Sequence, residues 1–193
     1  MNKQTIKAFF DGLASGWDAD MIRDDGIIDT ILEGACVAPG KHILDVACGT
    51  GVLFGDYLKR GAASVTAVDI SEEMVKIARE KYPGQVRVLQ GDAETLDFER
   101  KFDCILVYNA FPHFPEPENL IRVLSGWLEP GGTLTVAHGM SRAAIDRHHE
   151  GAASQVSRGL MHEDQLERIF GKYLNVTVKI SDDRMYQVTG RKA

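Results

Sequence analysis

The sequence predicts an α/β fold in which a mostly parallel sheet carries helices on both faces. Short β-branched, apolar segments alternate with helical patterns along the chain, as in a series of βαβ units. Apolar residues cover both faces of these segments, as strands buried in a parallel sheet require. The last two segments lie too close together for a crossover helix, so we expect them to form an antiparallel hairpin. With 193 residues, the chain is expected to form one domain, residues 1–193.

Each element follows from its local pattern. The predicted parallel strands are residues 43–47, 65–69, 86–89, 104–108 and 134–137. The predicted hairpin strands are residues 176–180 and 185–188, and the predicted helices are residues 71–82, 117–128, 141–149 and 162–173. The helix at 71–82 has the clearest signals, because Ser71 can cap its start and Pro83-Gly84 ends it. The helix at 117–128 is expected to end at a turn containing Pro130, Gly131 and Gly132.

Composition and charge exclude several classes of protein. The formal net charge is −6 and the basic residues are scattered, so a nucleic-acid partner is not expected. Three cysteines without a C-x-x-C pair argue against a disulfide framework and favour a reducing, cytoplasmic environment. No stretch approaches the ~18 apolar residues of a membrane span, so no membrane association is expected.

A glycine-rich turn, DVACGTG at residues 45–51, follows the first predicted strand. Glycines at such a junction let the backbone approach a ligand closely, next to the free N–H groups of a helix N-terminus. A dinucleotide fingerprint needs G-x-G-x-x-G, but the gap between Gly51 and Gly55 is one residue too long. The run resembles the first motif of class I S-adenosylmethionine-dependent methyltransferases. The alanine in place of the first glycine is similar to the ubiquinone/menaquinone methyltransferase-like branch.

Other segments of the chain resemble the same family in the same order. VTAVDIS ends the second strand, and the resemblance implies that Asp69 binds the ribose hydroxyls and Ile70 packs on adenine. In the segment Gly91-Asp92-Ala93, the resemblance assigns the Asp92 side chain to the adenine amino group. Residues 102–114 and the L-x-P-G-G turn at 128–132 are similar to later motifs of the family. The family's fold is Rossmann-like, with a seven-stranded sheet whose last strand is reversed.

The resemblance implies S-adenosyl-L-methionine as cofactor and methyl transfer to a small-molecule acceptor. The cofactor-binding residues expected from it are Trp17, Asp45, Ala47, Cys48, Gly49, Thr50, Gly51, Asp69, Ile70, Met74, Asp92, Ala93 and Asn109. Residues 1–37 resemble the family's N-terminal lid, and this segment contains Phe9, Phe10 and Trp17. Alternatives remain: a βα turn without a ligand, a nonenzymatic cofactor-binding module, or a nicotinamide-dependent oxidoreductase.

Methyl transfer is an in-line displacement, so it depends on positioning and needs a base only if the acceptor arrives protonated. Histidines gather after the fourth and fifth strands, and His113, His138 and His148 are the candidate catalytic residues. Residues 139–161 are expected to form an insert over the acceptor pocket. No metal is expected, because the histidines show no H-x-x-x-H or H-x-H spacing. The accepting atom and the oligomeric state stay open.

Overall fold

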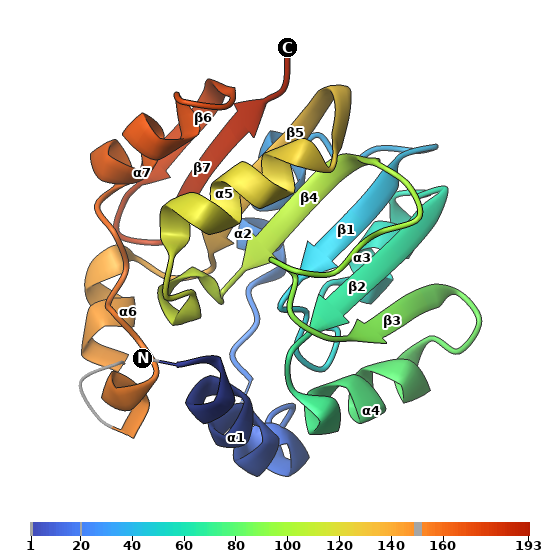
Figure 1. Cartoon of the computed structure of the whole chain (residues 1–193), viewed down its shortest axis with the longest axis vertical. Coiled ribbons are helices and arrows are strands. Elements are labelled where there is room, and N and C mark those ends of the chain that lie inside the picture. The colour runs from blue at the N-terminus through green and yellow to red at the C-terminus, as the bar shows by residue number, and fades with distance from the viewer. Residues whose placement is uncertain (1, 20, 149–151) are drawn as a thin grey trace.

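The computed structural model describes residues 2–19, 21–148 and 152–193. Within these residues, seven strands form one sheet in the order β3-β2-β1-β4-β5-β7-β6 (Figure 1). Neighbours from β3 to β5 pair in parallel, and β7 is antiparallel to both β5 and β6. The strands are β1 His42–Val46, β2 Ser64–Asp69, β3 Val86–Gln90, β4 Phe102–Tyr108, β5 Leu128–His138, β6 Asn175–Ser181 and β7 Tyr186–Arg191. The predicted Rossmann-like fold and its antiparallel hairpin are confirmed.

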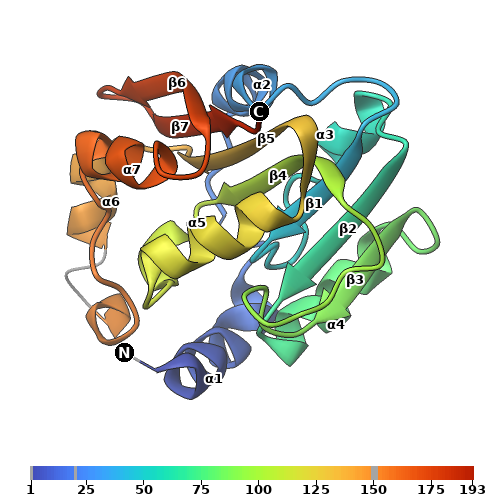
Figure 2. The same cartoon turned by 45° about the horizontal axis from the view of Figure 1, so that its top comes forward.

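Helices cover both faces of the sheet (Figure 2). Residues of α2, α3 and α4 share one apolar cluster with one face of the central strands, while α5 and α7 pack on the other. The helix α1 lies beyond the carboxyl ends of β1 and β2 (Figure 1). The helical elements are α1 Lys3–Leu13, η1 Ala14–Gly16, α2 Asp25–Gly34, α3 Phe54–Lys59, α4 Glu72–Lys81, η2 Phe111–His113, α5 Pro117–Gly126, α6 Arg142–His148, η3 Ala152–Gln155 and α7 Glu163–Phe170.

The start of β5 differs from the sequence prediction. The predicted strand begins at residue 134, after a turn, but β5 begins at Leu128. Leu128 pairs with Phe102 of β4, and the register then shifts before Cys104 pairs with Thr133. The turn residues therefore belong to an irregular part of the strand. The capping prediction for α4 is confirmed, since the Ser71 side chain accepts a hydrogen bond from the Met74 N–H.

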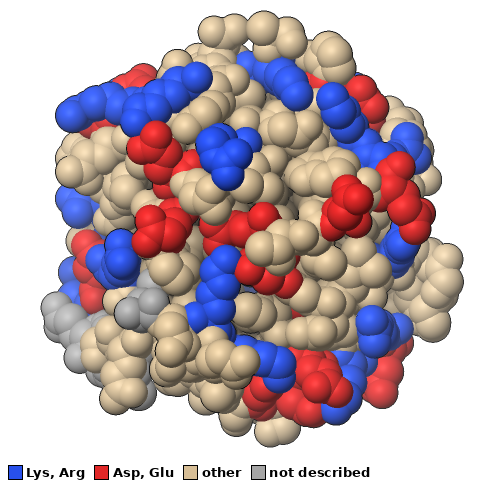
Figure 3. Space-filling model, viewed as in Figure 1, with Lys and Arg blue, Asp and Glu red and all other residues tan. Residues whose placement is uncertain are grey.

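Charged side chains of both signs are interspersed on the face seen in Figure 3. Many of them form ion pairs close to the surface, as between Arg87 and Glu99 at 2.7 Å. Exposed pairs of this kind contribute little to stability, typically below about 1 kcal/mol. The fold therefore depends mainly on the two apolar clusters that sandwich the sheet.

Gly51 follows the first strand in a tight turn with φ +84°. A Cβ atom built on this residue would overlap the ring of Phe54, which is fully buried at the start of α3. Gly51 is therefore required for packing as well as for backbone conformation. Gly40 has a similar φ of +81°, but nothing lies within 4 Å of a Cβ there.

We predict that Gly51→Ala lowers the free energy of unfolding by about 1–3 kcal/mol more than Gly40→Ala does, because only the first adds overpacking to the strain of a positive φ. Urea unfolding of both variants measures the difference. Equal losses would show that the Phe54 ring moves aside without cost.

Candidate active site

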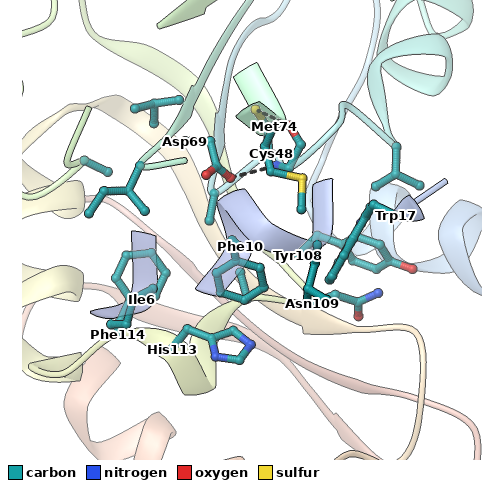
Figure 4. A pocket seen from close by; sticks show the side chains of 18 of the residues that line it. Ile6, Phe10, Trp17, Cys48, Asp69, Met74, Tyr108, Asn109, His113 and Phe114 are labelled. Atoms are coloured by element: carbon teal, nitrogen blue, oxygen red, sulfur yellow. Dashed lines mark hydrogen bonds between the residues drawn. The ribbon is translucent and has the colours of Figure 1, made fainter. Parts of the chain in front are cut away.

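A cavity of about 620 Å³ opens at the carboxyl edge of the sheet. Its walls come from the N-terminal residues, the turn after β1, the ends of β2 and β3, and the loops after β4 and β5 (Figure 4). Open α/β sheets bind ligands at this edge, where the strand order reverses. Here the strand order reverses between β1 and β4. The chain connections on the β1 side of this point cross one face of the sheet, and those on the β4 side cross the other.

The turn after β1 forms the floor of one half of the cavity. Ala47 and Gly49 both lie in the left-handed region, with φ of +55° and +53°. One carboxylate oxygen of Asp69 accepts a hydrogen bond from the Gly49 N–H at 2.8 Å, and the other accepts from the Ser71 N–H at 2.8 Å. Asp69 thus joins the glycine turn to the first turn of α4. A Cβ on Gly49 would meet only the Trp17 ring at 3.9 Å, so the space above this residue is open.

Residues 3–18, here called the N-terminal cover, close the cavity from above. Phe10 and Trp17 line it, and their rings pack edge to face at 5.8 Å. The Asp18 carboxylate accepts from the Thr50 hydroxyl at 2.5 Å and pairs with Lys81 at 2.7 Å. These contacts fasten the cover to the glycine turn and to α4.

The end of β3 supplies a second carboxylate to the cavity wall. One Asp92 oxygen accepts from the Glu94 N–H at 3.0 Å, and the other pairs with the Lys3 ammonium at 2.7 Å. Burial alone would lower the pKa of Lys3, but its contacts with Asp92 and Glu94 outweigh burial and raise it. Lys3 therefore stays charged near the cavity.

The other half of the cavity is mainly apolar and aromatic. Phe114, Met140 and Ile145 line it together with Tyr108 and His113. The His113 Nδ1 lies 2.8 Å from the Val156 carbonyl oxygen, which can only accept, so Nδ1 carries the proton and donates it. In the neutral ring the lone pair then belongs to Nε2. The His113 ring also packs edge to face on Phe10 at 4.9 Å (Figure 4).

The loops after β4 and β5 are joined by a side chain. Asn109 has φ +53° and accepts a hydrogen bond from the Gly139 N–H at 2.9 Å. Asparagine tolerates this conformation better than most residues. A Cβ on Gly139 would overlap the Tyr108 hydroxyl, so glycine makes room for that ring.

Comparison with known proteins relates part of the chain to a known family. A family model described as "Methyltransferase domain" matches residues 43–132. The ubiquinone biosynthesis O-methyltransferase of Coxiella burnetii (strain Dugway 5J108-111) is 29% identical over 143 residues, 69% of this chain and 61% of that protein. Residues 43–132 of the chain are therefore similar to a methyltransferase domain. The chain spans less than two thirds of the length of that relative.

Two further proteins show the same likeness. The ubiquinone biosynthesis O-methyltransferase of Xanthomonas campestris pv. campestris (strain B100) is 38% identical over 101 residues, 50% of this chain and 42% of that protein. The N-methyltransferase NodS from Bradyrhizobium japonicum, solved with S-adenosyl-L-homocysteine, superposes with a TM-score of 0.74 at 14% identity, over 100% of this chain and 99% of that one. The second likeness concerns the class I methyltransferase fold.

The structure brings most of the residues expected at the cofactor and catalytic site to one cavity. Those that line it are Trp17, Ala47, Cys48, Gly49, Asp69, Ile70, Met74, Asp92, Ala93, Asn109, His113 and His138. Three others lie behind the wall: Asp45 is buried, Thr50 bonds to Asp18, and Gly51 packs on Phe54. The roles assigned to all of these residues stay predictions.

The candidate histidines differ in their surroundings. His113 is half-buried on η2, whereas His138 is buried at the end of β5, with its ring 6.2 Å from that of Tyr186. His148 ends α6, and its side chain, like the whole of His149, lies outside the described part of the chain. His113 is therefore the histidine best placed to meet a bound molecule.

Sequence reasoning missed several lining residues, namely Lys3, Arg23, Tyr108 and Met140. Tyr108 ends β4, next to a predicted cofactor residue, so its place at the carboxyl edge was open to prediction. No sequence signal marks Lys3 or Arg23, because the partners that hold them at the cavity, Asp92 and Asp56, are distant along the chain. Arg23 donates to Asp56 and to the Val52 carbonyl, both at 2.8 Å.

Within residues 2–19, 21–148 and 152–193, no group of three or more His, Cys, Asp or Glu side chains could hold a metal ion. Over the same ranges, no helix has both the length and the apolar character needed to cross a membrane.

A buried carboxyl group lies beneath the glycine turn. Burial, with a smaller contribution from the Asp69 carboxylate, raises the pKa of Asp45 to about 8. Burial likewise raises the pKa of Asp69, although its hydrogen bonds from Ser71 and Gly49 oppose the rise. Near neutral pH the folded protein therefore holds a proton on Asp45 that the unfolded chain releases.

We predict that this proton makes stability depend on pH. Its contribution is fully present below the ordinary carboxyl pKa of about 4 and is lost as the pH rises towards 8, by at most about 1.4 kcal/mol per pH unit. The Asp45→Asn variant mimics the protonated group and should show a shallower fall. Urea unfolding of both proteins at several pH values measures the slopes, and identical slopes would contradict the assignment.

Proposed function

We propose that this protein transfers a methyl group from S-adenosyl-L-methionine to a small-molecule acceptor by in-line displacement. The observation that carries the proposal is that the cavity at the carboxyl edge of the sheet has two unlike halves. One half presents a glycine turn and two carboxylates, Asp69 and Asp92. The other half presents apolar side chains and His113. Displacement at a methyl group needs donor and acceptor held side by side in this way.

The chain's residues fit the cofactor. Gly49 leaves open space above the turn, next to the helix N-terminus of α3. Asp69 and Asp92 reach the cavity wall from neighbouring strand ends and can accept from hydroxyl and amino groups. Ile70 and Met74 add apolar surface beside them. When bound, the cofactor supplies an activated methyl group on a positively charged sulfur.

The acceptor is proposed to be uncharged and largely apolar where it enters the cavity. Of the charged residues that line the cavity, Asp69 and Asp92 belong to the cofactor half and Lys3 is paired with Asp92. Arg23 is held by Asp56. Little charge is left to receive a charged acceptor, whose burial without a partner would be costly.

The chain's part in the reaction is to exclude water, align the acceptor and accept its proton where it has one. Phe10 and the loop after β4 close over the acceptor half. His113 holds its tautomer through the Val156 carbonyl, so Nε2 is the proton acceptor we assign. Residues 1–37 are proposed to form the lid and residues 139–161 the insert over the acceptor pocket.

The proposal also covers the class of binding partner and the cellular compartment of the enzyme. Mixed surface charge (Figure 3) supports a small-molecule partner rather than nucleic acid. Cys36, Cys48 and Cys104 are thiols, which supports a reducing compartment such as the cytoplasm.

A direct test compares S-adenosyl-L-homocysteine with NAD in thermal unfolding. A ligand at about 100 times its dissociation constant stabilises the folded state by about 2.7 kcal/mol, so the first compound should raise Tm and NAD should not. Transfer of labelled methyl groups into a small-metabolite extract then tests the reaction. Stabilisation by NAD would favour an oxidoreductase, and binding without transfer a nonenzymatic module.

We predict that Gly49→Val abolishes binding of S-adenosyl-L-homocysteine while the protein still folds, because the side chain would occupy the space above the turn. Gly40→Val is the matched control, since it has a similar positive φ away from the cavity. Calorimetric titration measures both. Unchanged binding by the Gly49 variant would place the ligand elsewhere.

We predict that His113→Ala lowers turnover by ~10²-fold with cofactor affinity nearly unchanged, as expected for a base that acts on the acceptor. His138→Ala is expected to have a smaller effect, because that ring is buried. His42→Ala is the control, since His42 bonds to Ser64 at the start of β1. Steady-state kinetics with an acceptor found in the extract measures all three, and normal turnover by the His113 variant would exclude the base.

A further inference from the structure

The ammonium group of Lys3 contacts two carboxylates at once. It lies 2.7 Å from an Asp92 oxygen and 2.6 Å from a Glu94 oxygen. Lys3 and Asp92 both line the cavity, while the Glu94 side chain is only 2% exposed. Two acidic groups this close would repel each other, and one cation between them removes that repulsion.

The segment Asp92 to Glu94 is fixed by these contacts. The Glu94 N–H donates to the Asp92 carboxylate at 3.0 Å. A further Glu94 oxygen accepts from the Asn119 side chain of α5 at 2.6 Å. Lys3 therefore completes a network that sets the direction of the Asp92 carboxylate at the cavity wall.

Lys3 also anchors α1 at its first residue. Ile6 is the buried residue of this helix, and Phe10 adds ring contacts with Trp17 and His113. At the far end of the helix, the Asp11 carboxylate accepts from the Ser71 hydroxyl at 2.7 Å. The N-terminal cover is thus held by polar contacts at both ends of α1, and one of them falls on Asp92.

We propose that Lys3 is a positioning residue that couples closure of the N-terminal cover to recognition of the adenine amino group. The inference rests on the proposed function, because it takes Asp92 as the partner of adenine. Each carboxylate oxygen has two acceptor sites, so Asp92 can accept from Lys3 and from an amino group together. Oriented by Lys3, the carboxylate presents acceptor oxygens to the cavity, which favours an amino group and disfavours a carbonyl oxygen.

The coupling acts in both directions. When the cover closes, Lys3 orients Asp92 for the base. When the base binds Asp92, it stabilises the orientation that Lys3 requires. The two events therefore strengthen each other, as linked equilibria must.

The experiment measures the affinities of S-adenosyl-L-homocysteine and S-inosyl-L-homocysteine, which differ in an amino and a carbonyl group on the base. The proteins are wild type, Lys3→Met, Lys3→Arg and the control Lys76→Met, whose ion pairs lie on the exposed face of α4. For Lys3→Met we expect about tenfold weaker binding of the adenosyl compound and little change for the inosyl compound. Lys3→Arg should restore most of the preference, and Lys76→Met should match wild type.

The outcomes separate this inference from the proposed function. If the wild type binds neither compound, the proposed function fails. If the wild type binds the adenosyl compound and Lys3→Met binds it equally well or more tightly, coupling through Lys3 is overturned. Equal weakening of both compounds also overturns it, because a purely structural role would not distinguish the bases. Circular dichroism confirms that each variant is folded before titration.

Discussion

The carboxylate of Asp69 holds the cofactor half of the site together. It accepts one N–H from the turn after β1 and one from the cap of α4, each at 2.8 Å. These bonds fix Gly49 against Ser71, so two βα junctions behave as one surface. This arrangement buries the Asp69 carboxylate next to Asp45, and burial raises the pKa of both carboxyl groups. Bonds from backbone N–H groups stabilise the ionised form of Asp69 and offset part of that cost.

Backbone strain gathers around the same cavity. Ala47 and Asn109 are non-glycine residues with positive φ, and they lie on the turns after β1 and β4, the two strands at the reversal of the sheet. Each left-handed residue costs roughly 1–2 kcal/mol. Local bonds maintain them: Asn109 accepts from Gly139, and the Asp69 bond holds Gly49 beside Ala47. Strain of this kind persists where the surrounding structure over-determines it, as at binding sites.

Elements with local signals could be predicted from the sequence, and those set by distant partners could not. The cap of α4 and the hairpin of β6 and β7 follow from neighbouring residues. The early start of β5 depends on Leu128 pairing with Phe102 across the sheet, which no local pattern reveals. The glycine turn follows from the local sequence, and its cofactor role is implied by a family resemblance, but the packing role of Gly51 depends on the ring of Phe54. Lys3 could not be predicted, because a single lysine has no pattern and its partners lie about ninety residues away.

The two halves of the cavity have different origins along the chain. The segment matched by the methyltransferase family model, residues 43–132, contains the glycine turn and both carboxylates of the cofactor half. The proposed acceptor half adds residues from outside that segment. His113 contacts both outer segments, because its ring packs on Phe10 of the N-terminal cover and bonds to the Val156 carbonyl, which lies after β5. A change at the Phe10 or Val156 contact can therefore move this ring while the bonds of Asp69 to Gly49 and Ser71 stay in place.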